Sequence, residues 1–424
     1  MSQPSSPNER LTALLPATFV APRYDGRSVA NLPTTVGHLL GVTEGWAGAA
    51  LEPTLLEKLG DGVQRVVLLL VDGLGWNRLQ AQLPRDDAGF QDVLDRYAVL
   101  NAPITSVAPS TTSVATTVLL CNGAAPAETG MLGYSFLLPH SGVVANMLFW
   151  YPVGKSQPIY GELEGWGIDP ETFLGTLSTA EVLASADIPM RVIMPKAYSD
   201  SPLSRMRPRG AALDGFINAT DMWFKLGAWL EETAGKKAYA YAYYADFDTL
   251  SHRDGCDAPV WEALWRDFNF QLTRFFEGLS ARQRDGTLFL ITADHGHVVT
   301  PPREARFLQD YPGLLEHSLL TPGGEPRHVY LYARAGHKAE LLAYARAHLS
   351  DAFAVLDGAE ALAAGLYGDP ARLHPDAARR VGDVVLLAKG AHFLWNKESP
   401  TSLLGLHGSL TADEMLVPLI GLRP

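Results

Sequence analysis

Cysteine, long hydrophobic runs and excess positive charge are all scarce in this sequence, and each scarcity excludes a class of protein. Cys121 and Cys256 are the only cysteines in 424 residues and stand in no C-x-x-C pattern, so we expect two free thiols rather than a disulfide framework. No hydrophobic run approaches the ~18 residues of a membrane-spanning helix, and the N-terminus lacks the basic and then hydrophobic stretches of a signal peptide. We therefore expect a cytoplasmic protein with no membrane partner.

The charge balance of the chain is acidic. Lys and Arg total 34 against 46 Asp and Glu, which gives a formal net charge of −12. Such a surface repels the phosphate backbone, which argues against a nucleic acid duplex as a partner. A small anionic substrate is compatible with this charge if bound metal ions supply local positive charge.

Short hydrophobic runs closed by turn residues alternate with helical patterns along the chain. Continuous runs of this kind are typical of strands that are buried on both faces. They fall at 66–71, 189–194, 238–245, 287–293, 328–333, 383–388 and 415–421. Helices are predicted at 112–120, 219–234 and 338–349. The alternation predicts an α/β fold with a largely parallel central sheet sandwiched by helices.

Two segments depart from this alternation. The first 35 residues are rich in Pro, Ser and Asn, and we expect them to be extended, ahead of one α/β domain over residues 36–424. Residues 134–235 are rich in Gly, Pro and aromatic residues, and we interpret them as an inserted cap that shapes a substrate pocket. Additional structure that only covers the core is the alternative for this segment.

The most informative feature is that several predicted strands end in strong metal ligands. The runs VVLLLVDG (66–73), YYADFDTLSH (243–252) and LFLITADHG (288–296) close on Asp or on Asp and His, and LHGSL near the C-terminus adds a further His. The side chains concerned are Asp72, Asp248, His252, Asp294, His295 and His407. Packing gives an apolar strand no reason to end this way, whereas sites in open α/β sheets lie beyond the carboxyl ends of the strands. Such a set fits two divalent cations, Zn²⁺ or Mn²⁺, better than one structural zinc ion.

A hydroxyl-rich segment, APSTTSVATTV (108–118), is the expected source of a nucleophile. A hydroxyl residue at a helix N-terminus faces unpaired backbone N–H groups and the positive end of the helix dipole, which together favour a phosphate group. A Thr hydroxyl attacks only after activation, here by metal coordination. The alternative is that Ser110, Thr111 and Thr112 are only helix N-caps.

The ordered series VDG, PSTT, DFDTLSHRDG, ADHG and LHG resembles the type I phosphodiesterase/nucleotide pyrophosphatase family of the alkaline phosphatase superfamily over nearly the whole chain. The resemblance implies an alkaline phosphatase-like fold and two metal ions, usually zinc. It also implies one ion held by Asp72, Thr112, Asp294 and His295, and the other by Asp248, His252 and His407. Thr112 would be the nucleophile that forms a covalent phosphothreonine. The resemblance assigns no role to His297, which follows ADHG.

The expected activity is metal-dependent hydrolysis of phosphodiester or nucleotide pyrophosphate bonds in a small-molecule phosphate ester or nucleotide. Phosphomonoesterase, phosphonate hydrolase and phosphomutase are alternatives that use the same two-metal site, and a degenerate metal-binding regulatory protein is the non-enzyme alternative. No Arg or Lys lies within ten residues of Thr112 to bind a monoester dianion, unless Arg205, Arg207 or Arg209 folds back. The aromatic-rich stretch 134–166 would suit the organic group of a diester.

Two other enzyme classes are disfavoured by specific departures from their motifs. A sulfatase needs C/S-x-P-x-R, whereas Cys121 stands in CNGAA. A nucleotide-binding dehydrogenase needs a third glycine after the turn that VVLLLVDGLG resembles, and this chain has G-x-G alone.

Overall fold

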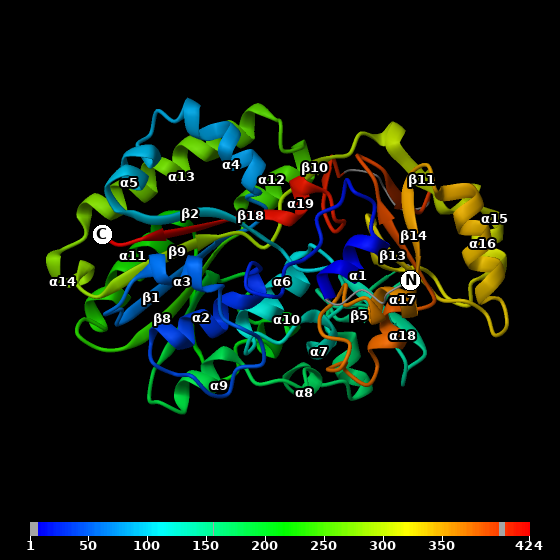
Figure 1. Cartoon of the computed structure of the whole chain (residues 1–424), viewed down its shortest axis with the longest axis horizontal. Helices are drawn as coiled ribbons and strands as arrows, with labels where there is room; N and C mark the ends of the chain where they lie inside the picture. The colour runs from blue at the N-terminus through cyan, green and yellow to red at the C-terminus, as the bar shows by residue number, and fades with distance from the viewer. Residues whose placement is uncertain (1–6, 156, 398–402) are drawn as a thin grey trace.

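The protein is described by a computed structural model over residues 7–155, 157–397 and 403–424. Two seven-stranded sheets form the framework, one in each half of the molecule as drawn in Figure 1. The larger hydrophobic core surrounds the first sheet and continues onto one face of the second, and a smaller core covers the other face of the second sheet. Within the described ranges, no helix combines the length and hydrophobicity that a bilayer crossing requires.

The first sheet is the predicted central sheet, with the strand order β2-β18-β9-β1-β8-β6-β7. Its strands are β1 (Arg65–Val71), β2 (Ala98–Thr105), β6 (Met190–Pro195), β7 (Ala212–Phe216), β8 (Ala238–Tyr244), β9 (Thr287–Thr292) and β18 (Leu416–Leu422). Within this sheet, β18 alone runs antiparallel to its neighbours, β9 and β2. Every residue of β1 is buried, because its continuous hydrophobic run is covered on both faces.

Helices cover both faces of the first sheet. In Figure 1, α4 (Trp76–Gln82), α5 (Phe90–Tyr97) and α13 (Pro259–Gly278) lie above it, and α2 (Leu32–Leu39) and α9 (Thr179–Ala184) lie below it. The prediction of a largely parallel sheet sandwiched by helices is therefore confirmed.

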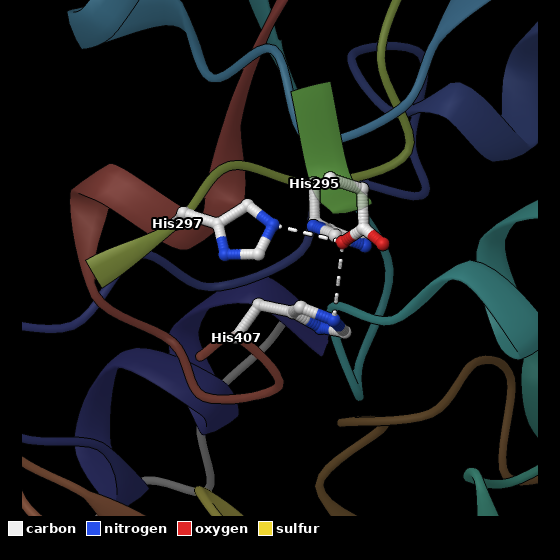
Figure 2. A group of neighbouring side chains, drawn as sticks. His295, His297 and His407 are labelled. Atoms are coloured by element: carbon white, nitrogen blue, oxygen red, sulfur yellow. Dashed lines mark hydrogen bonds and ion pairs between the residues drawn. The ribbon is translucent and has the colours of Figure 1, made fainter. Parts of the chain in front are cut away.

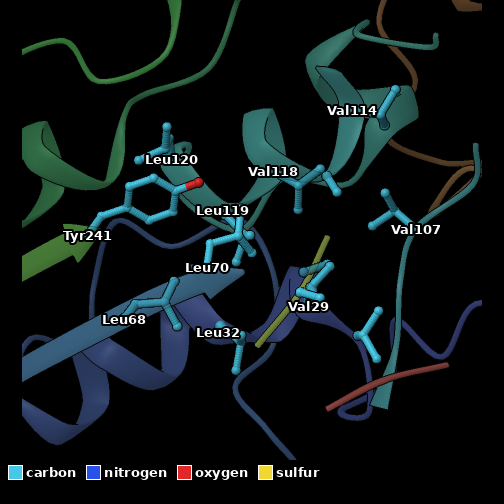
Figure 3. Close-up of a cluster of buried hydrophobic side chains, with 14 of the residues drawn as sticks. Val29, Leu32, Leu68, Leu70, Val107, Val114, Val118, Leu119, Leu120 and Tyr241 are labelled. Carbon is cyan, nitrogen blue, oxygen red and sulfur yellow. The ribbon is translucent and has the colours of Figure 1, made fainter. Parts of the chain in front are cut away.

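Helix α6 (Thr112–Leu120) is apolar or small on all sides, and every residue after Thr112 is buried. Figure 3 shows Val118 and Leu119 of this helix in one hydrophobic cluster with Leu70 of β1 and Val29. A helix that is hydrophobic all round is held by its surroundings rather than by one face. This packing fixes the direction of α6 and thereby the position of Thr112 in its first turn.

The second sheet is antiparallel throughout, with the order β14-β15-β13-β12-β3-β4-β5. Its strands are β3 (Ser135–Leu138), β4 (Val143–Asn146), β5 (Tyr151–Pro152), β12 (Gly323–Glu325), β13 (His328–Leu331), β14 (Phe353–Asp357) and β15 (Val384–Ala388). The strands predicted at 328–333 and 383–388 thus exist, but they do not join the parallel sheet. Hydrophobic runs identify strands without identifying their partners, and here α16 (Lys338–Leu349) buries its own apolar side chains against this second sheet.

Two short strand pairs and several helices complete the chain. The pairs are β10 (Val298–Val299) with β17 (Gly405–Leu406), and β11 (Ala305–Phe307) with β16 (Phe393–Trp395). The other helices are α1 (Pro7–Leu14), α3 (Pro53–Leu59), α7 (Pro126–Thr129), α8 (Pro170–Phe173), α10 (Pro202–Met206), α11 (Ala219–Glu232), α12 (Asp246–Asp254), α14 (Ala281–Arg284), α15 (Pro312–His317), α17 (Gly358–Ala363), α18 (Ala377–Val381) and α19 (Ala412–Met415).

The two segments that depart from the alternation are both built into the fold. Residues 134–235 are divided, since β3, β4 and β5 join the second sheet while β6, β7 and α11 belong to the first. The boundaries of this segment and its role as a cap stay predictions. The first 35 residues, expected to be extended, contain α1, because Leu11, Leu14 and Leu15 form one hydrophobic stripe that packs on the core.

Candidate metal centre and active site

Three adjacent strands of the first sheet, β9, β1 and β8, carry the acidic residues to one edge. Asp72 directly follows β1, Asp294 stands two residues beyond β9, and Asp248 lies in the first turn of α12, which follows β8. Because these strands are parallel, their carboxyl ends meet at the same edge of the sheet. The structure therefore brings the three carboxylates together.

The histidines reach the same edge from three elements. His252 lies one helical turn after Asp248 on α12, which places both on one face of the helix. His295 follows Asp294, and His407 follows the short strand β17. All six side chains that the strand-end pattern predicts thus converge.

One half of the cluster is deeply buried and includes the hydroxyl of Thr112. His295 Nε2 lies 3.5 Å from Asp72 Oδ1 and 3.6 Å from Asp294 Oδ2, and these three side chains are at most 1% exposed. Thr112 Oγ1 is 3.0 Å from His295 Nε2 and 3.4 Å from both carboxylate oxygens of Asp72. The ligand atoms of Asp72, Asp294 and His295 all lie within 4.8 Å of one another, which is close enough to hold one ion.

The other half is centred on Asp248 and is more open. Asp248 Oδ1 lies 3.3 Å from His252 Nε2 and 3.7 Å from His407 Nε2. His297 Nε2 is 2.8 Å from the same oxygen, and Figure 2 shows its ring beside those of His295 and His407. The side chains of Asp248 and His252 are 19% and 25% exposed, so the cluster is accessible to solvent from this side.

Backbone carbonyls orient three of the histidines in the same way. His252 Nδ1 lies 2.7 Å from the carbonyl oxygen of Gly405, His295 Nδ1 lies 3.1 Å from that of Gly296, and His407 Nδ1 lies 3.0 Å from that of Ser110. A carbonyl oxygen only accepts, so each Nδ1–H donates and each Nε2 keeps its lone pair. This is the arrangement that protein histidines adopt when Nε2 binds a metal ion.

The electrostatics of the cluster also fit bound cations. Burial and the charges of Asp294 and Asp248 raise the pKa of Asp72 well above its usual value. Burial, together with His295 and His252, lowers the pKa of His407 well below its usual value. Burial opposes protonation of His252, yet the Asp248 carboxylate raises its pKa to about 9. Divalent cations would stabilise ionised carboxylates and neutral imidazoles at once.

Two further features of the cluster are unfavourable unless a cation is bound. Asp294 Oδ2 is buried, and within the described ranges it has no hydrogen-bond partner. The Nε2 atoms of His252 and His407, each carrying a lone pair, face each other at 3.3 Å. Buried polar atoms are almost always satisfied, so both observations fit residues that hold metal ions.

Among the three candidate hydroxyls, only that of Thr112 reaches the cluster. Ser110 Oγ donates to the carbonyl oxygen of Ser409 at 2.7 Å. Thr111 is the N-cap residue of α6, but its side chain makes no capping hydrogen bond and instead contacts the Glu325 carboxyl. The capping interpretation therefore does not account for these hydroxyls.

Arg207 and Tyr243 support the site, and the motifs do not indicate either of them. Arg207 is buried, and it donates to the hydroxyl of Thr116, which in turn donates to the backbone carbonyl of Thr112. Arg207 thus lies beneath α6, but its hydrogen bonds among the described residues join it to Thr116 and to the backbone of α10, and not to the side chains of the cluster. The hydroxyl of Tyr243 donates to Asp72 Oδ2. Tyr243 stands at the end of β8, where an aromatic residue is also typical of an ordinary strand, so no sequence signal marks its role.

The fold and these side chains define an α/β protein whose sheet edge gathers carboxylate and imidazole groups that could hold divalent cations. The model of the type I phosphodiesterase/nucleotide pyrophosphatase family matches residues 66–410. The chain therefore belongs to this family of metal-dependent phosphoric ester hydrolases. No curated protein matches the sequence significantly.

Solved structures show the same architecture at low sequence identity. Murine ectonucleotide pyrophosphatase/phosphodiesterase 5 is 18% identical, with a TM-score of 0.63 over 84% of this chain and 88% of that chain. An inactive form of the murine protein in complex with AMP has the same identity and TM-score over 84% and 87%. Phosphonoacetate hydrolase from Sinorhizobium meliloti 1021, in complex with phosphonoformate, is 18% identical with a TM-score of 0.59 over 85% and 90%. These likenesses support the alkaline phosphatase-like fold that the sequence resemblance implies.

Proposed function

We propose that this protein hydrolyses phosphodiester or nucleotide pyrophosphate bonds, with Thr112 as the nucleophile and two divalent cations as cofactors. One cation would be held by Asp72, Thr112, Asp294 and His295, and the other by Asp248, His252 and His407. The observation that carries the proposal is the shared orientation of His252, His295 and His407, whose Nε2 lone pairs all point to the carboxylates. Imidazole and carboxylate ligands together favour Zn²⁺, and Mn²⁺ is the alternative.

The chemistry follows from the surroundings of Thr112. Bound in this cluster, the cations would supply positive charge that lowers the pKa of the Thr112 hydroxyl. Thr112 Oγ1 then attacks phosphorus and displaces the alcohol or phosphate leaving group, which gives a phosphothreonine. Water attacks the same phosphorus in a second step, restores the hydroxyl and releases the phosphoryl product. The first-turn N–H groups of α6 lie at the positive end of its dipole, where they favour the phosphoryl oxygens.

Tyr198 suggests where the organic part of a substrate would bind. Its ring centre lies 6.4 Å from that of Tyr243, which bonds Asp72, and the residue is 42% exposed. Stacking of a base on such a ring contributes ~1–3 kcal/mol. The predicted aromatic wall over 134–166 is smaller than expected, because Phe136 and Trp150 are core residues while Phe149 and Tyr160 remain exposed. The exposed Tyr198 ring, rather than the stretch 134–166, therefore favours a diester or nucleotide over a small monoester.

The activity test compares four substrates under identical metal conditions. We expect an aryl nucleotide diester and a nucleotide pyrophosphate to be hydrolysed at least tenfold faster than an aryl phosphomonoester. A chelator should abolish the reaction, and added Zn²⁺ should restore it. Phosphonoacetate is the fourth substrate, because the fold is shared with phosphonoacetate hydrolase. A clear preference for the monoester or the phosphonate would replace the diester assignment.

Matched variants test the nucleophile. Thr112→Ala should lower kcat by several orders of magnitude while the metal content stays at two equivalents. Thr111→Ala is the control, since its side chain contacts Glu325 and not the cluster, and its activity should stay within about threefold of the parent. Retention of configuration at phosphorus would support the covalent step, since two inversions restore the starting configuration. Inversion would exclude it.

Two further expectations belong with this proposal. We also propose a cytoplasmic location, which the two free thiols of Cys121 and Cys256 favour. A regulatory protein that only binds metal would show no chelator-sensitive turnover, so the same assay tests the non-enzyme alternative.

A further inference from the structure

We propose that His297 is a positioning residue, whose Nε2–H holds the carboxylate of Asp248 in the orientation that a metal ion requires. This inference rests on the proposed function, because Asp248 is one of the proposed ligands. Neither the strand-end pattern nor the family resemblance assigns His297 a role.

The contact between His297 and Asp248 is short and shielded from water. The His297 side chain is 1% exposed, and its Nε2 lies 2.8 Å from Asp248 Oδ1. His407 approaches the same oxygen at 3.7 Å, and Figure 2 shows the two rings reaching one carboxylate. Of the histidines that approach this oxygen, His297 is therefore the closest, at hydrogen-bonding distance.

The hydrogen-bonding pattern separates His297 from the proposed ligand histidines. His252, His295 and His407 each donate Nδ1–H to a backbone carbonyl, whereas Nδ1 of His297 is buried without a hydrogen-bond partner in the described part of the chain. An ionised carboxylate only accepts, so the His297 proton lies on Nε2. His297 Nε2 is near enough to the ligand atoms of Asp248, His295 and His407 to be a ligand by distance alone. A nitrogen that carries this proton has no lone pair for a cation, so His297 acts through Asp248.

The slot that holds the His297 ring exists because two neighbouring residues have no side chain. Gly73, in the VDG motif, has φ +76°, and a Cβ there would lie 2.9 Å from Cδ2 and 3.0 Å from Nε2 of His297. A Cβ at Gly405 would lie 3.4 Å from Nδ1 of His297 and 2.3 Å from the carbonyl oxygen of Ser251. The ring is therefore confined on two sides by backbone, which suits a group that must keep one orientation.

Confinement of the ring has a measurable consequence for metal binding. A carboxylate that is already held by a neighbour loses less conformational freedom when the ion binds. Loss of such an outer hydrogen bond to a ligand usually weakens metal affinity about 10–100-fold. We expect that loss for the ion held by Asp248, His252 and His407.

The experiment compares two variants of similar size and length in the full chain. His297→Gln keeps an N–H donor near the position of Nε2, whereas His297→Met has none. His317→Gln is the control, because His317 pairs with His337 and contacts none of the proposed ligands. Zn²⁺ stoichiometry and affinity are measured by competition with a chromophoric chelator, and the visible spectrum of the Co²⁺-loaded protein reports ligand geometry. Urea unfolding of the metal-free proteins reports the fold.

A positioning role predicts two Zn²⁺ equivalents in all proteins. The affinity of the site formed by Asp248, His252 and His407 should be about 10–100-fold lower in His297→Met and within about threefold of the parent in His297→Gln. Unchanged affinity in His297→Met overturns the proposal, and lower stability of the metal-free variant with unchanged affinity shows a purely structural role. Loss of one equivalent in both variants shows that His297 is itself a ligand. A parent protein that binds no Zn²⁺ would instead refute the proposed function, and the His297 proposal with it.

Discussion

Substitution of the buried ion pair between Arg327 and Glu414 tests how the active-site loops are held. Neither side chain is exposed. Arg327 Nε donates to Glu414 Oε1 at 2.6 Å, and Nη2 donates to Oε2 at 2.9 Å. The same guanidinium also donates to the carbonyl oxygens of His392 and Gly390, at 2.6 Å and 2.8 Å.

Glu414 connects this pair to both loops that carry proposed ligands. Its carboxylate accepts from the N–H of Ser409, two residues after His407, at 2.9 Å. Its backbone carbonyl accepts from the N–H of Gly296, directly after His295, at 3.0 Å. Loss of the pair should therefore reduce both stability and metal affinity.

The size of the effect follows from the groups that are left unpaired. Arg327→Met leaves the Glu414 carboxylate buried without its cation, which costs about 3–5 kcal/mol. The unsatisfied carbonyl groups of Gly390 and His392 add about 1 kcal/mol each. The double variant Arg327→Met/Glu414→Gln contains no buried charge, so we expect it to recover about half of the loss.

Urea unfolding of the metal-free proteins measures these differences. The reasoning is refuted if Arg327→Met unfolds at the midpoint of the parent, or if the double variant loses the sum of the two single variants. Acid provides a second readout. Burial opposes ionisation of Glu414, yet the Arg327 charge lowers its pKa. The stabilisation that Glu414 contributes in the parent is complete above its unfolded pKa, about 4.3, and is lost as pH falls through the lower folded pKa. In Arg327→Met the uncompensated burial raises this pKa instead, so the stability difference between parent and variant should begin to shrink above about pH 4.3 and shrink further below it.

Three further predictions concern the site itself. Tyr243→Phe removes the hydrogen bond to Asp72 and should lower kcat/KM about 10–100-fold. Tyr239→Phe, on the same face of β8, is the control and should leave kcat/KM unchanged. The Tyr239 hydroxyl is buried and has no hydrogen-bond partner in the described residues. Arg207→Met should lower kcat with little change in metal content, since the side chain supports α6 through Thr116 and contacts no proposed ligand; loss of metal would contradict this role. Removal of metal with a chelator should lower the thermal unfolding midpoint, and Zn²⁺ should restore it, because ligands that bind only the folded state stabilise it; an unchanged midpoint would argue against a buried metal centre.

The sequence indicates the proposed acidic and imidazole ligands because the end of a buried strand can be recognised from the sequence alone. A buried parallel strand is a continuous hydrophobic run, so the Asp that closes it is conspicuous, as at Asp72 and Asp294. All parallel strands end at one edge, which turns separate motifs into a single site without knowledge of their pairing. The helix at 112–120 can also be predicted from the sequence, because a Pro and hydroxyl residues precede an apolar run.

The arginines that support the site, Arg207 and Arg327, cannot be predicted in this way, because their contacts join distant parts of the chain. Arg207 bonds Thr116 across 91 positions, and Arg327 bonds Glu414 across 87. Neither Arg differs in its local pattern from a surface residue. The sequence does not predict the second sheet for a related reason, since β13 and β15 are about 50 residues apart and their hydrophobic runs do not specify the partner.

The place of β18 in the first sheet has a consequence for how this protein is made. Among the described residues, β18 (416–422) is the last strand of this sheet in sequence order, yet it lies between β2 and β9, in the interior of the sheet. During synthesis, β2 and β9 each keep one unpaired edge until β18 has been made and inserted between them. Open edges of this kind recruit other chains, so partly made copies should be prone to aggregate and to depend on chaperones. A product truncated before residue 416 would lack the strand that joins β2 to β9 and would keep both of these edges unpaired.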